Sequence, residues 1–171
     1  MRWMVVILVG LWIGSISVGA AEVVLLYSGN TQSFLEVCGC TENQLGGVGR
    51  RATALRMLRQ THPGALVLDA GGLFAGDSAL DQLRCAVHVQ AMRKMEYDAA
   101  NVGAGELRFG RQFFEVQRDT GGVAFLGTNM RSDGELVPTF RQFERNGLRL
   151  GVIGVTGLAA ASEHKLKGDP G

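Results

Sequence analysis

Two cysteines separated by a single glycine carry the most distinctive chemistry in this sequence. Cys38 and Cys40 stand in a segment rich in glycine and polar residues. Thiols at this spacing can close a small, strained disulfide, and strained or exposed disulfides are the ones that undergo redox exchange readily. The pair therefore predicts a thiol redox element, with a redox partner in an oxidising compartment as its counterpart.

The third cysteine leaves two other interpretations open. A bridge from Cys38 or Cys40 to Cys85 would be a structural staple of the kind that secreted domains use. His88 follows Cys85 by three residues, so a helix would place both on one face. Cys38, Cys40, Cys85 and His88 could then bind zinc or copper. The alternative for His88 is a surface or half-buried helix residue without a ligand.

Carboxylates and arginines form a second set of candidates. Asp69, Asp77 and Glu106 could hold a hard cation, because such ions prefer oxygen ligands. Their alternative role is loop capping, and Asp77, directly before a predicted helix, suits the N-cap position. Arg50 and Arg51 begin another predicted helix, where they could meet an anionic small molecule or form a solvated face.

The elements that must position these residues alternate between strand and helix. Short apolar runs predict strands at 23–27, 65–69, 99–102 and 123–126, and helical spacing predicts helices at 48–60, 78–95 and 111–119. Alternation of this kind is typical of an α/β fold built from right-handed βαβ units around a mainly parallel sheet. In the second helix, the expected buried stripe is Leu80, Leu83, Val87 and Ala91.

A hairpin and a rim of loops complete the expected architecture. Asn146-Gly147 favours a tight turn, so segments 139–144 and 148–153 are predicted to form a β-hairpin that returns the chain to the sheet. Ligands bind at the carboxyl ends of the strands in open parallel sheets. The glycine-rich loops 28–46, 70–77 and 103–110 should therefore converge on one candidate site.

Length and charge exclude several classes of protein. The chain has 171 residues and a formal net charge of +1, with 46% apolar residues. This length suits one domain, and the balance of charge gives no footprint for binding nucleic acid. Residues 1–20 are typical of a secretory signal peptide, which predicts a periplasmic or secreted protein without a membrane anchor after cleavage. The expected domain spans 21–157, followed by an irregular tail at 158–171.

Five motifs in one order carry a resemblance to a known family. They lie at 26–31 (LYSGNT), 46–51 (GGVGRR), 66–76 (LVLDAGGLFAG), 97–106 (YDAANVGAGE) and 150–154 (LGVIG). Together they resemble the amino-terminal half of the calcineurin-like metallophosphoesterase domain of periplasmic 5′-nucleotidases. The resemblance implies a metallophosphoesterase-like fold, incomplete in this sequence, whose missing half could be supplied by a second chain.

The same resemblance implies a change of chemistry. Enzymes of that family hold two divalent metals through an Asp-x-His motif, a further Asp and an Asn-His-Glu motif. The corresponding positions here carry residues without the expected ligand atoms, namely Gly29, Thr31, Gly72, Ala104 and Gly105, and only Glu106 is retained. Glycine and alanine have no side-chain atom that can bind a metal ion, and it is the metal ions that polarise phosphate and generate hydroxide. Relatives with selenocysteine in the loop of Cys38 and Cys40 would fit redox chemistry.

Three functions follow from these observations. The first is an exported 5′-nucleotidase-like pseudoenzyme that acts in thiol redox chemistry or binding through Cys38 and Cys40. The second is a metal-dependent phosphoesterase or 5′-nucleotidase, a hydrolase that uses other ligands. The third is an assembly module or a Cys/His metal-binding protein.

Overall fold

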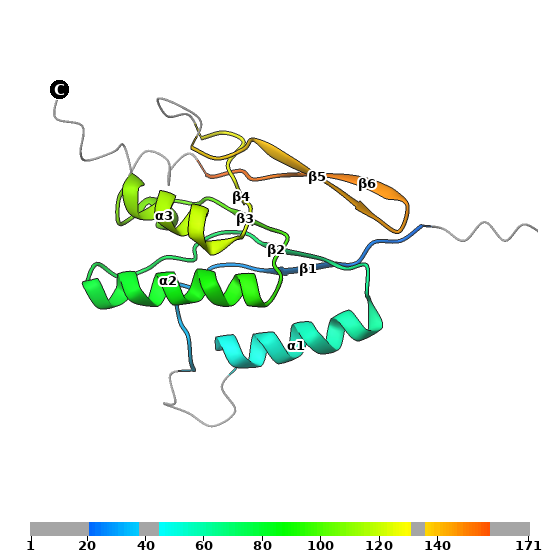
Figure 1. The fold of residues 1–171 in the computed structure, drawn as a ribbon, viewed down its shortest axis with the longest axis horizontal. Helices are drawn as coiled ribbons and strands as arrows, with labels where there is room; N and C mark the ends of the chain where they lie inside the picture. The colour runs from blue at the N-terminus through cyan, green and yellow to red at the C-terminus, as the bar shows by residue number, and fades with distance from the viewer. Residues whose placement is uncertain (1–20, 38–44, 131–135, 158–171) are drawn as a thin grey trace, which may run out of the picture.

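The protein contains a four-stranded parallel sheet covered by helices on one face. The computed structural model describes residues 21–37, 45–130 and 136–157. The strands β1 (Leu25–Ser28), β2 (Leu66–Asp69), β3 (Ala99–Asn101) and β4 (Phe125–Leu126) lie in the order β1-β2-β3-β4, and all three neighbouring pairs are parallel. This arrangement confirms the predicted α/β class and its parallel sheet (Figure 1).

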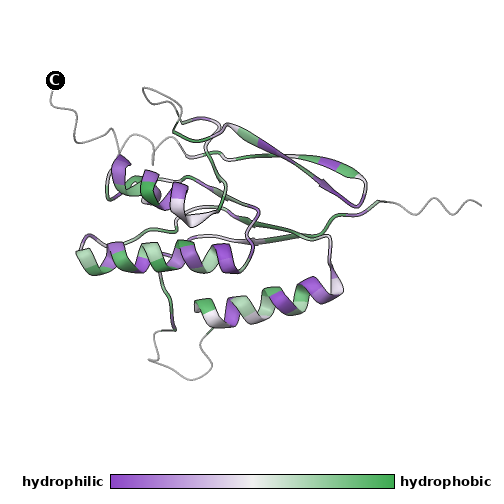
Figure 2. Ribbon diagram, in the orientation of Figure 1, coloured by the Kyte–Doolittle hydropathy of each residue, from purple (hydrophilic) through white to green (hydrophobic). Residues whose placement is uncertain are grey.

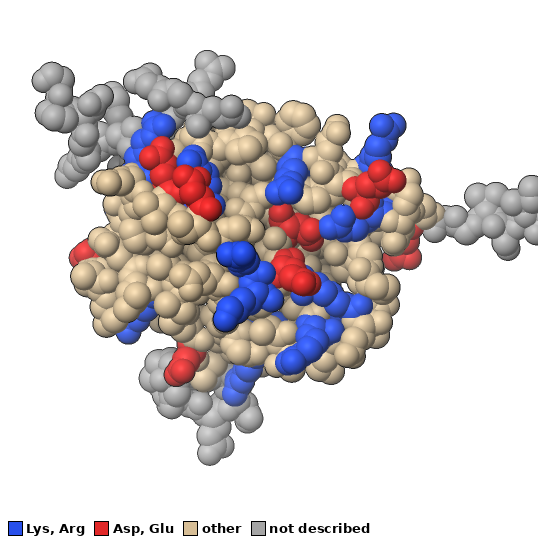
Figure 3. All heavy atoms as spheres, in the orientation of Figure 1, with Lys and Arg blue, Asp and Glu red and all other residues tan. Residues whose placement is uncertain are grey.

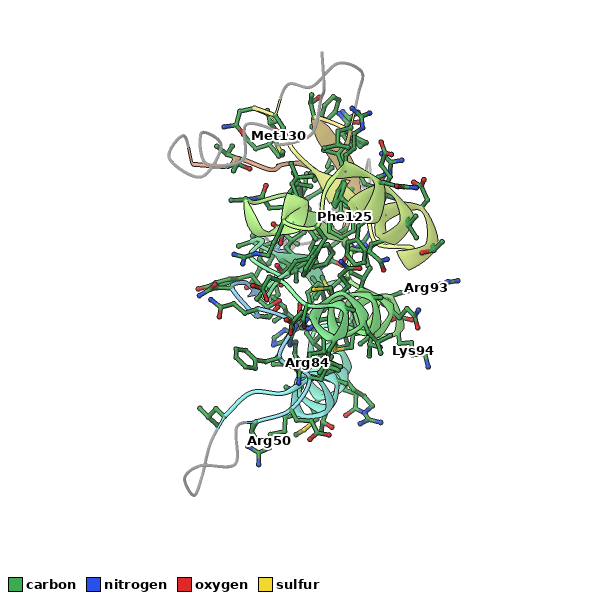
Figure 4. All side chains as sticks on the ribbon, turned by 90° about the vertical axis from the view of Figure 1, so that its left-hand side faces the viewer. Arg50, Arg84, Arg93, Lys94, Phe125 and Met130 are labelled. Carbon is green, nitrogen blue, oxygen red and sulfur yellow. The ribbon has the colours of Figure 1, made fainter. Side chains whose placement is uncertain are left out.

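Three helices connect these strands. They are α1 (Val48–Thr61), α2 (Ala79–Lys94) and α3 (Arg111–Gly121), and a short 3₁₀ turn, η1 (Gly105–Leu107), precedes α3. Figures 1 and 4 show the helices packed on the same side of the sheet. Among the described helices, none has the length and apolar character needed to cross a membrane.

The hydrophobic core lies between the helices and the sheet. It contains Val67, Ala100 and Phe125 from the strands, Leu55 from α1, Val89 and Met92 from α2, and Phe114 from α3. Phe125 lies inside the molecule in Figure 4, and apolar and polar residues alternate along the helices in Figure 2. Acidic and basic side chains are interspersed over the face shown in Figure 3.

The buried face of α2 differs from the predicted stripe. Leu80, Leu83 and Val87 are exposed, whereas the fully buried residues of this helix are Cys85, His88, Val89 and Met92. Two polar side chains therefore occupy the face that packs on the core. The prediction was wrong because it counted only apolar residues at helical spacing, and here a cysteine and a histidine take part in the packing.

The amino-terminal end of α2 is fixed by a capping box. Ser78 is the N-cap residue: its hydroxyl accepts a hydrogen bond from the Asp81 amide, and the Asp81 carboxylate accepts one from the Ser78 amide. Asp77, the residue expected at the N-cap, instead donates its backbone N–H to Asp81. The expectation was wrong by one residue, because Ser78 is an equally good cap and has an acidic residue three positions later.

The predicted hairpin forms, but as a separate sheet. Strands β5 (Phe140–Arg145) and β6 (Leu148–Ile153) pair antiparallel and are not hydrogen-bonded as strands to β1–β4. Asn146 and Gly147 have φ angles of 52° and 75°, as the tight turn requires. The expectation that the hairpin rejoins the parallel sheet was therefore wrong, and its antiparallel strands begin a second layer.

Candidate functional site

The loops that follow β1, β2 and β3 are tied together by hydrogen bonds. The Asn30 amide donates to the Gly71 carbonyl at 2.7 Å, and the Gln32 amide donates to the Gly72 carbonyl at 3.0 Å. An added Cβ at Gly71 would lie 3.0 Å from the Asn101 carbonyl, so the third loop is equally close. The described parts of these loops meet at the carboxyl ends of the strands, as the sequence predicts.

Glu106 holds two of these loops in place. Its side chain is fully buried in η1 and accepts hydrogen bonds from the backbone amides of Leu73, at 2.5 Å, and Gly103, at 2.7 Å. Burial raises the pKa of this carboxyl, and the amide hydrogen bonds oppose that rise. Both carboxylate oxygens are therefore engaged with the protein backbone.

Asp69 is engaged in a similar way at the end of β2. Its carboxylate accepts hydrogen bonds from the Ser28 hydroxyl, at 2.5 Å, and from the Gly71 amide, at 2.8 Å. The Ser28 hydroxyl also lies 2.8 Å from the Tyr97 hydroxyl. Burial raises the pKa of Asp69, while the contacts with Ser28 and Gly71 lower it. The side chain joins β1 to β2 and points inward.

His88 forms an interior polar cluster with α1 and the first loop. Its Nε2 lies 3.2 Å from the Arg51 guanidinium and 3.3 Å from the Thr31 hydroxyl. Because a guanidinium can only donate, Nε2 accepts and the proton of the neutral ring lies on Nδ1. Nδ1 is buried with no hydrogen-bond partner among the described residues. Burial first, and then the charge of Arg51, lower the pKa of His88 to about 4.

This position of His88 corrects the sequence-based interpretation. A surface or half-buried residue was expected, but His88 is fully buried, on the same face of α2 as Cys85. Cys85 is a free, fully buried thiol whose Sγ lies 2.9 Å from the Ser33 hydroxyl, and burial raises its pKa. The bridge to Cys85 is thus not formed in this structure. Cys38 and Cys40 lie outside the described residues.

The two arginines at the start of α1 have different environments. Arg50, which is labelled near the lower end of Figure 4, is exposed, whereas Arg51 is half-buried against His88. Arg51 also lines a pocket of about 410 Å³, together with Thr31, Gly47 and the acidic Glu36. Arg51 therefore combines a fixed position with access to a pocket.

The described residues do not fit a two-metal centre. They contain no group of three or more histidine, cysteine, aspartate or glutamate side chains placed to hold a metal ion. Asp69 and Glu106 use their carboxylates for the hydrogen bonds given above. The hard divalent cations of phosphoesterases require several oxygen or nitrogen ligands directed at one point. No such set exists in this part of the chain.

Three glycines at positions that the resemblance aligns with metal ligands are closely enclosed. An added Cβ would lie 3.0 Å from the Ala70 Cβ at Gly29, 3.1 Å from the Asn30 Cα at Gly72, and 2.8 Å from the Phe74 carbonyl oxygen at Gly105. Gly72 also has a φ of 73°, which disfavours other residues. The neighbouring loops occupy the space in which ligand side chains would start.

Sequence reasoning missed two side chains at this rim. Asn30 lies beside Gly72, with its Oδ1 3.3 Å from the position of an added Gly72 Cβ, and Gln32 donates to Asn30 Oδ1 at 3.1 Å. Thr31, between them, faces His88 in the interior. Asn30 and Gln32 are separated by one residue, as the two ligands of an Asp-x-His motif are. An alignment shifted by one residue from Gly29 and Thr31 would therefore have identified them.

Known proteins that resemble the chain in sequence are 5′-nucleotidases. No family model matches the chain. A snake venom 5′-nucleotidase from Naja atra is 33% identical over 94 residues, which are 52% of this chain and 18% of that protein. The chain thus spans about a fifth of the length of this relative. The similarity lies in the N-terminal region of 5′-nucleotidases, and it establishes homology to that region.

Solved structures define the class of fold. A 5′-nucleotidase precursor from Thermus thermophilus superposes with a TM-score of 0.71 at 23% identity, over 80% of this chain and 29% of that one. The calcineurin-like phosphoesterase YfkN from Bacillus subtilis has a TM-score of 0.62 at 17% identity, over 85% of this chain and 52% of that one. The described architecture is therefore a fragment of the metallophosphoesterase fold.

The buried histidine makes the stability of the protein depend on pH in a defined direction. The unfolded state gains a proton at His88 near the ordinary pKa of 6.5, whereas the folded state resists protonation until about pH 4. Between these values the unfolded state binds more protons, so this residue makes stability rise with pH. Its contribution across that window is on the order of 3 kcal/mol.

We expect His88→Gln to flatten the rise of the unfolding free energy between pH 4 and 6.5, measured by urea denaturation. The exposed His62 provides the matched control, because His62→Gln should keep the wild-type slope. An unchanged slope in His88→Gln would contradict a buried, neutral His88.

Proposed function

We propose that this chain is an exported, 5′-nucleotidase-like domain that binds an anionic small molecule and does not hydrolyse phosphate esters. The enclosure of Gly72 and Gly105 by neighbouring residues carries this proposal. A ligand side chain at Gly72 or Gly105 would start 3.1 Å from the Asn30 Cα or 2.8 Å from the Phe74 carbonyl oxygen, so the neighbouring backbone would have to shift to admit it. The rim is therefore a different site from that of a metallophosphoesterase.

The side chains at the rim support a binding role. Asn30 and Gln32 are neutral amides, which donate and accept hydrogen bonds but lack the negative charge that a pair of divalent cations requires. We assign them, in place of Gly29 and Thr31, to the Asp-x-His positions of the family. Arg51 supplies a positive charge beside the same loop and is fixed by its hydrogen bond to His88. The guanidinium favours an anionic group of the ligand, and Glu36 in the same pocket would meet a hydrogen-bond donor of that ligand.

Export is part of the same proposal. The apolar segment within residues 1–20 has the pattern of a signal peptide, and the Naja atra relative is a venom protein. In an oxidising compartment, Cys38 and Cys40 would form the redox element of the protein. We retain this role for the pair as a prediction, together with the open alternative of a metal set with Cys85 and His88.

Metal-dependent phosphoester hydrolysis is the second candidate function. The observation that favours it is the sequence similarity to 5′-nucleotidases, since 33% identity over half of the chain connects it to enzymes of that name. Ligands for divalent metals would then have to come from polypeptide outside the described residues. Activity measurements on the full chain distinguish the two functions directly.

We expect no metal-dependent hydrolysis of adenosine monophosphate or p-nitrophenyl phosphate by the full chain. Mn²⁺, Mg²⁺ and Zn²⁺ should each leave phosphate release at the level of the protein-free blank, because no described set of ligands can activate water. Metal-dependent turnover that is lost in Glu106→Gln would overturn the proposed function.

Restoring an acidic residue at the second motif should destabilise the protein without creating a metal site. Gly72→Asp combines an unfavourable φ with a contact of 3.1 Å to the Asn30 Cα. Gly147→Asp is the matched control, because Gly147 has a similar φ of 75° and nothing within 4 Å of an added Cβ. We expect Gly72→Asp to lower the unfolding free energy by roughly 1–3 kcal/mol more than the control. Equal losses in the two variants would show that the rim has room for a ligand.

Thiol labelling of the exported protein tests the redox element. We expect the native protein to be two hydrogens lighter than its reduced form, with one thiol, that of Cys85, labelled after denaturation without a reductant. Cys38→Ser and Cys40→Ser should each remove the mass difference, whereas Cys85→Ser should keep it. Three labelled thiols, or bound zinc or copper, would contradict a disulfide between Cys38 and Cys40.

A further inference from the structure

The turn of the hairpin is fastened to the segment that precedes β1. The Asn146 side chain donates through Nδ2 to the Glu22 carbonyl at 2.8 Å, and Figure 1 shows this turn beside the chain that enters β1. The same side chain packs against Gly64, where an added Cβ would lie 2.5 Å from Asn146 Oδ1 and 2.9 Å from Nδ2. Asn146 thus joins three segments that are distant in the sequence. We call its contacts with Glu22 and Gly64 the latch.

The residue that forms the latch stands in a chemically labile sequence. Asn146 is the only asparagine of the sequence that is followed by glycine. The backbone nitrogen of the following residue can attack the side-chain carbonyl of an asparagine, and glycine allows the closest approach because it has no side chain. Asn146 and Gly147 are both exposed, and nothing lies within 4 Å of an added Gly147 Cβ. Water therefore reaches the reacting atoms.

The backbone amide of Gly147 is free to react. Arg145 and Leu148 form the last pair of the hairpin, so the two residues between them lie outside its ladder of hydrogen bonds. Within the described residues, the Gly147 N–H donates no hydrogen bond. The latch is what opposes attack, because its contacts restrict the rotation of the Asn146 side chain toward the Gly147 nitrogen.

We propose that Asn146 is a site of spontaneous deamidation and that the latch sets the rate of this modification. The Gly147 nitrogen loses its proton to water or hydroxide and forms a bond to Asn146 Cγ, while the bond from Cγ to Nδ2 breaks and ammonia leaves. Water then opens the cyclic imide and leaves aspartate or isoaspartate at this position. No oxidant or reductant takes part. The proposal goes beyond the proposed function and does not depend on it.

Deamidation opens the latch permanently. A carboxylate in place of the Asn146 amide has no N–H to donate, so it would set an oxygen against the Glu22 carbonyl oxygen. The neighbouring Arg145 makes an ion pair with Asp98 at 2.6 Å, and Asp98 also accepts a hydrogen bond from the Val67 amide of β2. These contacts do not involve the amide. The modification therefore frees the segment before β1 and leaves the hairpin attached to the sheet.

Two glycine variants test the role of the latch. Gly64→Ala displaces the Asn146 side chain, because the added Cβ would lie 2.5 Å from its Oδ1, and the φ angle of Gly64 lies outside the left-handed region. Gly49→Ala is the matched control, because an added Cβ at Gly49 has nothing within 4 Å. The full chain of each variant is incubated at mildly alkaline pH. Peptide mass mapping then measures the replacement of each asparagine amide by a carboxylate.

We expect Asn146 to convert faster than Asn129, which precedes methionine and serves as the internal control. Gly64→Ala should accelerate conversion about fivefold, the equivalent of one net hydrogen bond, while Gly49→Ala should stay within about twofold of the wild type. The wild-type chain unfolded in urea should convert at least as fast as Gly64→Ala, which tests the latch if that variant does not fold.

The product can be examined separately through Asn146→Asp. This variant should speed hydrogen exchange in segment 22–28 about fivefold, because the bond to Glu22 is lost. No conversion at Asn146, faster conversion at Asn129, or equal rates in the two glycine variants would overturn the proposal. So would equal rates in the folded and unfolded wild-type chain, or unchanged exchange in Asn146→Asp.

Discussion

The carboxylate of Glu106 is the interaction on which the arrangement of the rim depends. It accepts hydrogen bonds from backbone amides in two loops, after β2 and after β3, and it does so from a fully buried position. A buried carboxylate needs such donors to offset the cost of desolvation. These hydrogen bonds draw the loops after β2 and β3 close together. Gly72 and Gly105, which have no side chains, allow this close approach. The same closeness places an added Cβ within 3.1 Å of neighbouring backbone at both glycines.

A second polar cluster links this rim to the helices. Arg51 of α1, Thr31 of the first loop and His88 of α2 meet in the interior, and the low pKa of His88 keeps this cluster at the charge of a single guanidinium. Because His88 is neutral, Arg51 keeps a hydrogen bond instead of facing a second cation. The helix face that packs on the core thus also fixes the one cation that we assign to ligand binding.

The alternation of strands and helices could be predicted from the sequence, because apolar runs and helical spacing report burial directly. The parallel sheet, the three helices and the hairpin were all expected near their observed positions. The orientation of α2 was not, since a cysteine and a histidine on its buried face are invisible to a pattern of apolar residues. The cap at Ser78 and the separate layer of the hairpin depend on contacts between distant segments. At the rim, Asp69 and Glu106 could be singled out, but their inward orientation could not.

The central claim is that the ends of the strands form a binding rim without a pair of metals. Titration of the full chain with Mn²⁺, followed by the electron paramagnetic resonance signal of the free ion, tests this most directly, because that hard cation favours oxygen ligands over thiolates. The account predicts that the signal rises in proportion to added Mn²⁺ from the start. Two equivalents of bound Mn²⁺ that are released in Glu106→Gln would contradict it.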